Sequence, residues 1–382
     1  MYHDYLYHQK RKNLPLLIQL TFLVVGALLI IAFAVLYGDK PSETEATLIS
    51  PLMQNTSKES KKDYAFQLLY GEPKRILLKE TAGSEQTIKL VNLATNLSET
   101  LVSGKRIGFI GQLDSTIFLF LEDKEGLARF TISKYDIGTK ETEEFLAFQA
   151  PTTLALHELD HLVSLSPDKT RLTITHQSGI VIYTLNNENE ITILDNSSQE
   201  DCQKNENCLS YSKPLWISNR ELLIYQNTVN NQTPLVVNTS GNINAVLPNN
   251  LTDFAVSSKG FPLVGVDGET LFTIEAKKTT EVLKAKETRY ASPVWLGNEI
   301  VLFANEAGVP TIVRTDKLGK GLVVLKEFST NTVLSDLITD QGKENIFFVA
   351  TDKTNSNISI TFYKMGIKED KPESFYSISK NL

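Results

Sequence analysis

The residues best suited to chemistry form one short string, His157-Glu158-Leu159-Asp160-His161. On an α-helix, side chains four residues apart share a face about 6 Å apart, so two histidines could bind one zinc ion beside a glutamate that acts as general base. On a β-strand the same histidines lie about 13 Å apart and could not share an ion. The string therefore predicts a zinc-dependent hydrolase, with His157, Glu158 and His161 at its site, only where the segment is helical.

The residues around this string favour a strand. Apolar positions fit either periodicity, but the segment runs directly into Ser166-Pro167-Asp168, which is typical of a turn between two strands. A zinc site of the metzincin type would also need a glycine at 164 and a third histidine ligand at 167, where this chain has Ser164 and Pro167. We therefore expect the string to lead into an inner strand, and the zinc hydrolase is the alternative.

The rest of the sequence contains no other catalytic pattern. There is no G-x-S-x-G, no phosphate-binding loop and no dinucleotide fingerprint. The net charge of −7 argues against nucleic acid as a partner, because phosphate binding requires a basic surface. We predict no catalytic residue, no cofactor and no nucleic-acid partner.

The N-terminal part of the chain predicts a membrane anchor. Residues 14–37 carry no charge, and a helix of that length reaches about 36 Å, enough to cross a bilayer core of about 30 Å. The cluster Lys10-Arg11-Lys12 precedes this run, so the positive-inside rule places residues 1–13 in the cytoplasm and the later residues outside it. Residues 38–62 are polar and predict a linker. A cleaved signal peptide is the alternative, because Ala32-Phe33-Ala34 resembles a cleavage site.

Cys202 and Cys208 are the chain's two cysteines. They lie close together in a polar segment of the part that we expect to be exported, and this predicts a disulfide that closes a short loop. No other cysteine or histidine lies near them in the sequence, which argues against a metal pair.

From about residue 63 onward the sequence indicates an all-β domain. Short runs rich in Ile, Val, Leu, Phe and Tyr, such as RLTITH, IVIYTL and EIVLFAN, alternate with clusters of Gly, Asn, Asp, Ser and Pro. No long amphipathic helix interrupts them. This pattern is typical of short antiparallel strands joined by tight turns.

These strand runs recur in units of about 40 residues, the length of one four-stranded propeller blade. Pro214 and Trp216 precede one strand run as Pro293 and Trp295 precede another, and these are the chain's two tryptophans. A further copy contains Ser166-Pro167-Asp168. We interpret these residues as structural signatures of the repeat.

The stretch LSPDKTRLTIT and the two Pro-x-Trp copies resemble the Pro-Asp repeats of TolB-like, WD-type propellers. The resemblance covers about residues 64–380, and it implies a β-propeller that recognises other proteins at the cell envelope. The units open near residues 64, 107, 161, 213, 253, 292 and 333. The fold prediction is therefore an all-β propeller of seven four-stranded blades, preceded by one transmembrane helix. Six blades are the alternative.

The sequence thus predicts a single-pass membrane protein whose propeller, residues 63–382, lies outside the cytoplasm. We expect a non-enzymatic binding or scaffold module for a protein, peptide or glycan partner. The alternatives are the zinc-dependent hydrolase and an assembly subunit of a larger membrane complex. The identity of the partner and the oligomeric state are not predicted.

Overall fold

The computed structural model describes residues 64–123, 128–151, 159–197, 208–228, 231–275, 278–353 and 357–381. These residues belong to one compact unit, Lys61–Leu382. The predicted cytoplasmic tail, membrane helix and linker, residues 1–62, lie outside the described residues. In the described part of the chain, no helix is both long and apolar enough to span a bilayer.

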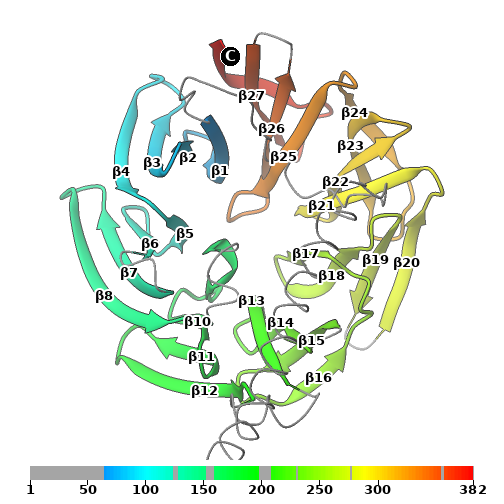
Figure 1. Ribbon diagram of the computed structural model, residues 1–382. Coiled ribbons are helices and arrows are strands. Elements are labelled where there is room, and N and C mark those ends of the chain that lie inside the picture. Colours follow the sequence, from blue (N-terminus) through cyan, green and yellow to red (C-terminus); the bar gives the residue numbers. More distant parts are fainter. Residues whose placement is uncertain are drawn as a thin grey trace, which may run out of the picture. The chain divides into compact units, whose positions relative to one another are not determined.

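The described residues form seven antiparallel four-stranded sheets, or blades, arranged in a ring, and each blade uses four consecutive strands (Figure 1). Blade 1 contains β1 (Tyr64–Glu72), β2 (Arg75–Ala82), β3 (Glu85–Asn92) and β4 (Ser98–Gly104), and blade 2 contains β5 (Ile107–Gln112), β6 (Ile117–Asp123), β7 (Arg129–Asp136) and β8 (Glu141–Gln149). Blade 3 contains β9 (Val163–Leu165), β10 (Arg171–His176), β11 (Gly179–Thr184) and β12 (Asn189–Asp195), and blade 4 contains β13 (Ser210–Ser218), β14 (Glu221–Asn227), β15 (Gln232–Asn238) and β16 (Ile243–Val246). Blade 5 contains β17 (Asp253–Ser257), β18 (Gly260–Val266), β19 (Thr270–Glu275) and β20 (Lys278–Lys284), and blade 6 contains β21 (Thr288–Leu296), β22 (Glu299–Glu306), β23 (Val309–Asp316) and β24 (Val323–Glu327). Blade 7 contains β25 (Thr332–Thr339), β26 (Asn345–Lys353), β27 (Asn357–Gly366) and β28 (Glu373–Asn381).

Each blade lies between two neighbours, which explains the uninterrupted apolar runs of its middle strands. In β6, Phe118 and Phe120 pack against blade 1. Leu119 and Leu121 point the other way and pack against blade 3. Successive residues of a strand alternate between its faces, so both faces of a middle strand must be apolar. The fourth strand lies at the rim and is more polar, as in β8, where residues 141–144 are exposed.

The two faces of the ring carry different connections. Because each blade has four antiparallel strands, its first-to-second and third-to-fourth turns lie on one face, which we call the turn face. The second-to-third turns and the connections between blades lie on the opposite face, the end face. Consequently β1 starts and β28 ends on the same face.

The ring closes without exchange of strands between its first and last blades. β1 stays in blade 1 and packs against β25 and β26 of blade 7. The N–H of Leu68 donates to a carboxylate oxygen of Asp336 at 3.0 Å. At Gly71 the strand passes so close to Phe347 that a Cβ would lie 2.4 Å from the ring. Side-chain packing and a hydrogen bond to a carboxylate therefore hold this seam.

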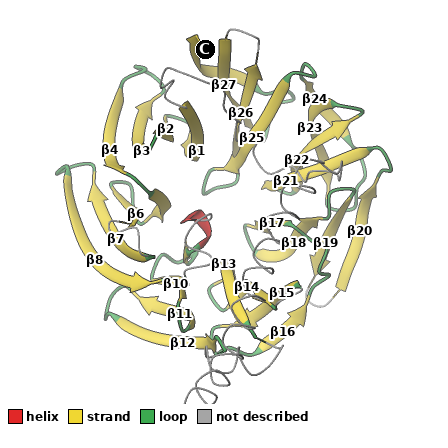
Figure 2. Cartoon of the chain, in the orientation of Figure 1, coloured by secondary structure: helices red, strands yellow, loops and turns green. Residues whose placement is uncertain are grey.

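The predicted all-β propeller of four-stranded blades is confirmed, with seven blades and not the alternative six. The histidine string was expected to lead into an inner strand, and the described part of it, residues 159–161, directly precedes β9. Leu159–His161 form one 3-10 turn, close to the centre of the ring in Figure 2, and β9 begins at Val163. The N–H of Leu162 donates to the Leu159 carbonyl at 3.1 Å and closes this turn, so these residues do not extend the sheet.

Candidate functional site

The turn between β25 and β26, residues 340–344, extends toward the propeller axis on the turn face (Figure 1). We call it the axial turn. The Gln341 amide Nε2 donates to Gln112 Oε1 of blade 2 at 3.3 Å. Lys169 Nζ of blade 3 donates to Gln341 Oε1, also at 3.3 Å. Neither blade is a neighbour of blade 7 in the ring, so the axial turn crosses the axis.

Lys343 fixes the same turn to blades 5 and 6. Its side-chain nitrogen donates to the carbonyl of Val256 in blade 5. Its own carbonyl accepts a hydrogen bond from the N–H of Gly297 in blade 6 at 2.7 Å. Burial lowers the pKa of Lys343 from 10.5 to about 8, because the charged ammonium loses water that the protein only partly replaces. The axial turn therefore links blade 7 to blades 2, 3, 5 and 6.

Tyr70 and Glu72 of blade 1 form a hydrogen-bonded group beside this turn. The Tyr70 hydroxyl hydrogen-bonds with Glu72 and lies 2.5 Å from Gln112 Oε1. Arg75 Nε donates to Glu72 Oε2 at 2.8 Å, and Arg75 Nη2 donates to the Ser115 carbonyl at 3.0 Å. Burial, followed by the hydrogen bond with Glu72, raises the pKa of Tyr70. Burial also acts to raise the pKa of Glu72, but the hydrogen bonds from Arg75 and Tyr70 outweigh it and lower that pKa.

These side chains near the axis form one polar group, which we call the axial cluster. Its members are Tyr70, Glu72, Arg75, Gln112, Lys169, Gln341 and Lys343. It offers hydrogen-bond donors, acceptors and both signs of charge, which suits the backbone and polar side chains of a bound peptide. Across the ranges that the structure describes, no three His, Cys, Asp or Glu side chains gather as metal ligands. The geometry of the axial cluster supports binding.

Two predicted sites fall partly outside the described residues. His157 and Glu158 lie outside them, so their metal and general-base roles stay predictions. His161 is exposed and lies just before β9, on the end face and thus on the face opposite the axial turn. Cys202 also lies outside the described residues, so its disulfide with Cys208 stays a prediction.

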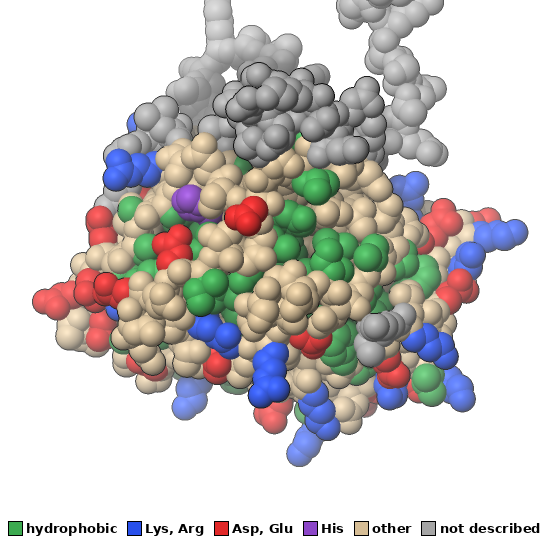
Figure 3. All heavy atoms as spheres, turned by 90° about the horizontal axis from the view of Figure 1, so that it is seen from below, with side chains coloured by type: hydrophobic (Ala, Val, Ile, Leu, Met, Phe, Trp, Pro, Cys, Tyr) green, Lys and Arg blue, Asp and Glu red, His purple; other side chains and the backbone are tan. Residues whose placement is uncertain are grey.

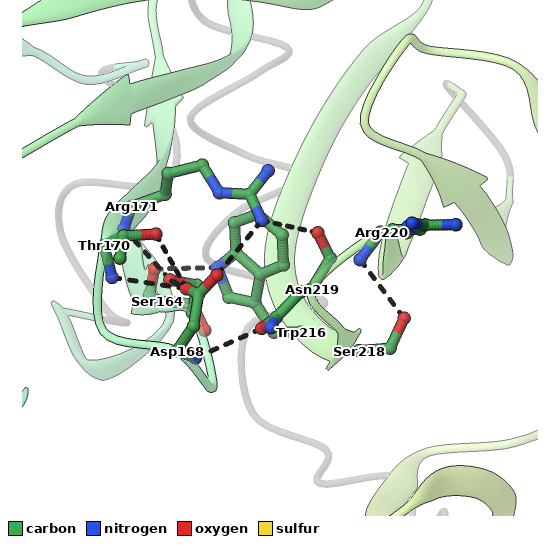
Figure 4. Close-up of polar contacts among 9 residues, drawn as sticks. Ser164, Asp168, Thr170, Arg171, Trp216, Ser218, Asn219 and Arg220 are labelled. Carbon is green, nitrogen blue, oxygen red and sulfur yellow. Dashed lines mark hydrogen bonds and ion pairs between the residues drawn. The ribbon is translucent and has the colours of Figure 1, made fainter.

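The predicted repeat turn of blade 3 is tied to blade 4 (Figure 4). Asp168 Oδ1 accepts hydrogen bonds from Ser166 Oγ at 2.6 Å, from Thr170 Oγ1 at 2.8 Å and from the Thr170 N–H at 3.2 Å. Burial acts to raise the pKa of Asp168, but these hydrogen bonds outweigh it and lower that pKa. The N–H of Asp168 donates to Asn219 Oδ1, in the corresponding turn of blade 4, at 3.1 Å.

Arg171 completes this link between blades 3 and 4 (Figure 4). Its Nη2 donates to the Asn219 carbonyl at 2.5 Å, and its guanidinium carbon lies 4.9 Å from the centroid of the Trp216 ring. The Trp216 indole in turn donates to the Ser164 carbonyl at 3.1 Å. Trp216 is 4% exposed. These repeat residues therefore fasten neighbouring blades to each other.

The second Pro-x-Trp copy has the same location in blade 6. Trp295 is 3% exposed, but its indole nitrogen has no hydrogen-bond partner within the described ranges. Pro214 and Pro293 lie at irregularities in the pairing of β13 with β14 and of β21 with β22. Proline has no N–H to donate to a neighbouring strand, and it is tolerated at these positions because the regular hydrogen-bond ladder is interrupted there.

Comparison with known proteins identifies a fold and no family. No protein-family model matches the sequence, and no curated protein matches it. A solved prolyl endopeptidase matches with a TM-score of 0.61 and 11% identity, over 83% of this chain and 50% of that chain. The propeller domain of the Trilobed protease from Pyrococcus furiosus matches with a TM-score of 0.58 and 11% identity, over 81% of this chain and 98% of that chain. TolB from Acinetobacter baumannii matches over 76% of this chain and 61% of that chain with 11% identity, but its TM-score of 0.40 is too low to support the finer TolB-like resemblance.

These structural likenesses correct the predicted function. The matching structures include several peptidases, and the chain spans about half the length of each. The predictions of a non-enzymatic binding or scaffold module and of no enzymatic role are therefore wrong. Strand runs and blade repeats report the architecture alone, so the sequence could not separate a scaffold from the propeller of an enzyme. The chain is a seven-bladed propeller with the fold of the propellers in these peptidases.

Proposed function

We propose that this chain is the propeller component of a peptidase and that it binds peptides at the axial cluster. The observation that carries the proposal is the match in fold to peptidase propellers over about four fifths of the chain. The match covers half of the prolyl endopeptidase.

The geometry of the axial cluster supports peptide binding on the turn face. Lys169 and Arg75 offer donors for peptide carbonyls and carboxylates, and Glu72 offers an acceptor for peptide N–H groups. The axial turn crosses the axis on the turn face, so a peptide that approaches from this face would meet these side chains. Both ends of the propeller leave from the opposite face.

We also propose that residues 14–37 anchor the chain in a membrane, with the propeller outside the cytoplasm. The length of the uncharged run and the cluster Lys10-Arg11-Lys12 before it support this orientation.

Peptide binding can be tested with the full chain and fluorescently labelled, unstructured peptides, followed by anisotropy. Lys169→Ala should weaken binding about tenfold, because a charge-assisted hydrogen bond contributes about 1.5–3 kcal/mol. Lys259→Ala is the matched control, since Lys259 is exposed in the corresponding turn of blade 5. Absence of binding at millimolar peptide, or equal losses in both variants, would refute peptide binding at the axial cluster.

The enzymatic part of the proposal needs a separate measurement. The full chain, purified from its native cells with the proteins that remain bound to it, should cleave peptides, and mass spectrometry of the products would reveal the cleavage sites. Material that binds peptides and leaves them intact would contradict the association with a peptidase.

A further inference from the structure

One loop of blade 6 exposes an unusual amount of apolar surface. Ten large hydrophobic residues are exposed among those that the structure describes, and four of them fall within residues 318–324. These four are Leu318 (61% exposed), Leu322 (47%), Val323 (45%) and Val324 (51%). Isolated exposed hydrophobic residues are normal on a protein surface, whereas a group this dense along the chain indicates a contact surface. Residues 317–322 form the turn between β23 and β24, on the turn face, and residues 323–324 begin β24; we call residues 317–324 the apolar loop.

The backbone of the apolar loop is held in place by its own hydrogen bonds. Asp316 Oδ1 accepts from the N–H groups of Leu318 and Lys320, each at 2.8 Å. The N–H of Asp316 donates to the Lys320 carbonyl at 3.2 Å. Gly319 has a φ of +74° and lies so close to β20 that a Cβ would be 2.2 Å from the Val282 carbonyl oxygen. Leu318 and Leu322 therefore belong to a preformed turn that is packed on blade 5, and Val323 and Val324 lie on the strand that follows it.

Basic side chains flank the apolar ones. Lys317 and Lys320 are both exposed. Asp316, directly before the apolar loop, is engaged in the backbone hydrogen bonds of the turn. Lys317 lies 3.8 Å from Glu275, but both side chains are more than half exposed, and such surface pairs contribute little. Segments that enter the interface of an anionic bilayer combine apolar residues such as leucine and valine with neighbouring lysines.

The exposed apolar residues of β16 lack this charge. Figure 3 views the molecule from the side of β12 and β16, where hydrophobic side chains are mixed with charged ones. Ile243 and Val246 of β16 are 50% and 65% exposed, yet their neighbours along the strand are Asn242, Asn244 and Ala245. The combination of apolar and basic groups thus distinguishes the apolar loop from this strand.

We infer that the apolar loop docks on the surface of an anionic lipid bilayer, with Leu318 and Leu322 entering the interface and the two lysines at the headgroups. The charge of Lys317 and Lys320 complements anionic lipid. A symmetric contact with a second copy would place these lysines against their own counterparts, which disfavours that occupant. The uncharged run at residues 14–37 points to a membrane as a neighbour of this chain.

The length of the chain permits this contact. Residues 38–63 reach at most about 90 Å when extended, whereas a nine-residue strand such as β1 spans about 30 Å between the two faces. The turn face can therefore reach a membrane that holds residues 14–37. Lipid contact at the apolar loop does not require peptide binding at the axial cluster, and either one can be disproved without the other.

Hydrogen exchange of the full chain, mixed with liposomes and separated by flotation, tests the inference. We expect exchange of residues 317–324 to slow at least fivefold with liposomes that contain phosphatidylglycerol, relative to phosphatidylcholine alone. Leu318→Ser with Leu322→Ser should abolish this protection, and Lys317→Gln with Lys320→Gln should reduce it. Ile243→Ser with Val246→Ser is the matched control and should leave it unchanged. All of these side chains are exposed, so the variants should fold.

Several results would overturn the inference. The first is that residues 317–324 exchange their amide hydrogens as fast in the chain that floats with anionic liposomes as in the chain kept in detergent. The second is equal protection in anionic and zwitterionic liposomes. The third is protection without lipid that increases with protein concentration, which would assign the apolar loop to a contact between copies. A chain that floats with neither liposome would also overturn it.

Discussion

Lys343 should make the propeller more stable as the pH rises from about 7 to about 9.5. Its pKa is about 8 in the folded state and about 10.4 in an unfolded chain. The unfolded state therefore holds more protons across this range, and the free energy of unfolding increases with pH. Linkage between the two pKa values gives an increase of about 2 kcal/mol. Below about pH 7 both states hold the proton, and the cost of burying the charge is fully present.

The substitution that isolates this effect is Lys343→Met, which keeps an unbranched side chain and removes the amine. Urea unfolding of the full chain can be followed by tryptophan fluorescence, because Trp216 and Trp295 both lie on inner strands of the propeller. The difference in unfolding free energy between wild type and Lys343→Met should change by about 2 kcal/mol between about pH 7 and 9.5. Lys259→Met, at an exposed lysine, should follow the wild type. A difference that stays constant with pH would refute the burial of Lys343 and its role in fixing the axial turn.

Two further predictions concern contacts between blades and a third concerns the turn that contains Asp168, and each can be checked by urea or thermal unfolding. Arg171→Ala should lower the free energy of unfolding by about 1–2 kcal/mol, because it removes a cation–π contact and the hydrogen bond to Asn219; unchanged stability would show that this link contributes nothing. Gly241→Ala should cost about 1–3 kcal/mol, because φ is +82° and the added Cβ would lie 2.1 Å from the Ile193 carbonyl oxygen; a neutral effect would contradict that close approach. The lowered pKa of Asp168 predicts a stabilising contribution that is complete above about pH 3.9 and is lost as the pH falls through the folded value. Asp168→Asn should therefore lose less stability on acidification than the wild type, and parallel losses would count against the hydrogen bonds to its carboxylate.

The ring of blades could be predicted because its packing imposes a local pattern on the sequence. Middle strands such as β6 and β10 are buried on both faces, so each appears as a short apolar run between turn residues. Trp216 and Trp295 recur because both fill the same position between neighbouring blades. The turn that contains Asp168 was recognisable because its side-chain hydrogen bonds are made within a few residues.

The axial turn could not be predicted for the opposite reason. Asp340-Gln341-Gly342-Lys343 looks like any polar turn between two strands. Its partners Gln112, Lys169 and Val256 lie 229, 172 and 87 positions away from the residues that they contact. Local spacing carries no information about such contacts. The histidine string was ambiguous in another way, since its apolar positions fit both a helix and a strand.

The absence of strand exchange at the seam has a genetic consequence. Because each blade is encoded by one uninterrupted segment, duplicating or deleting about 40 codons adds or removes a complete sheet without leaving half-sheets behind. Such a change alters the size of the ring, and the contact between β1 and β25 is the joint that must adjust to it.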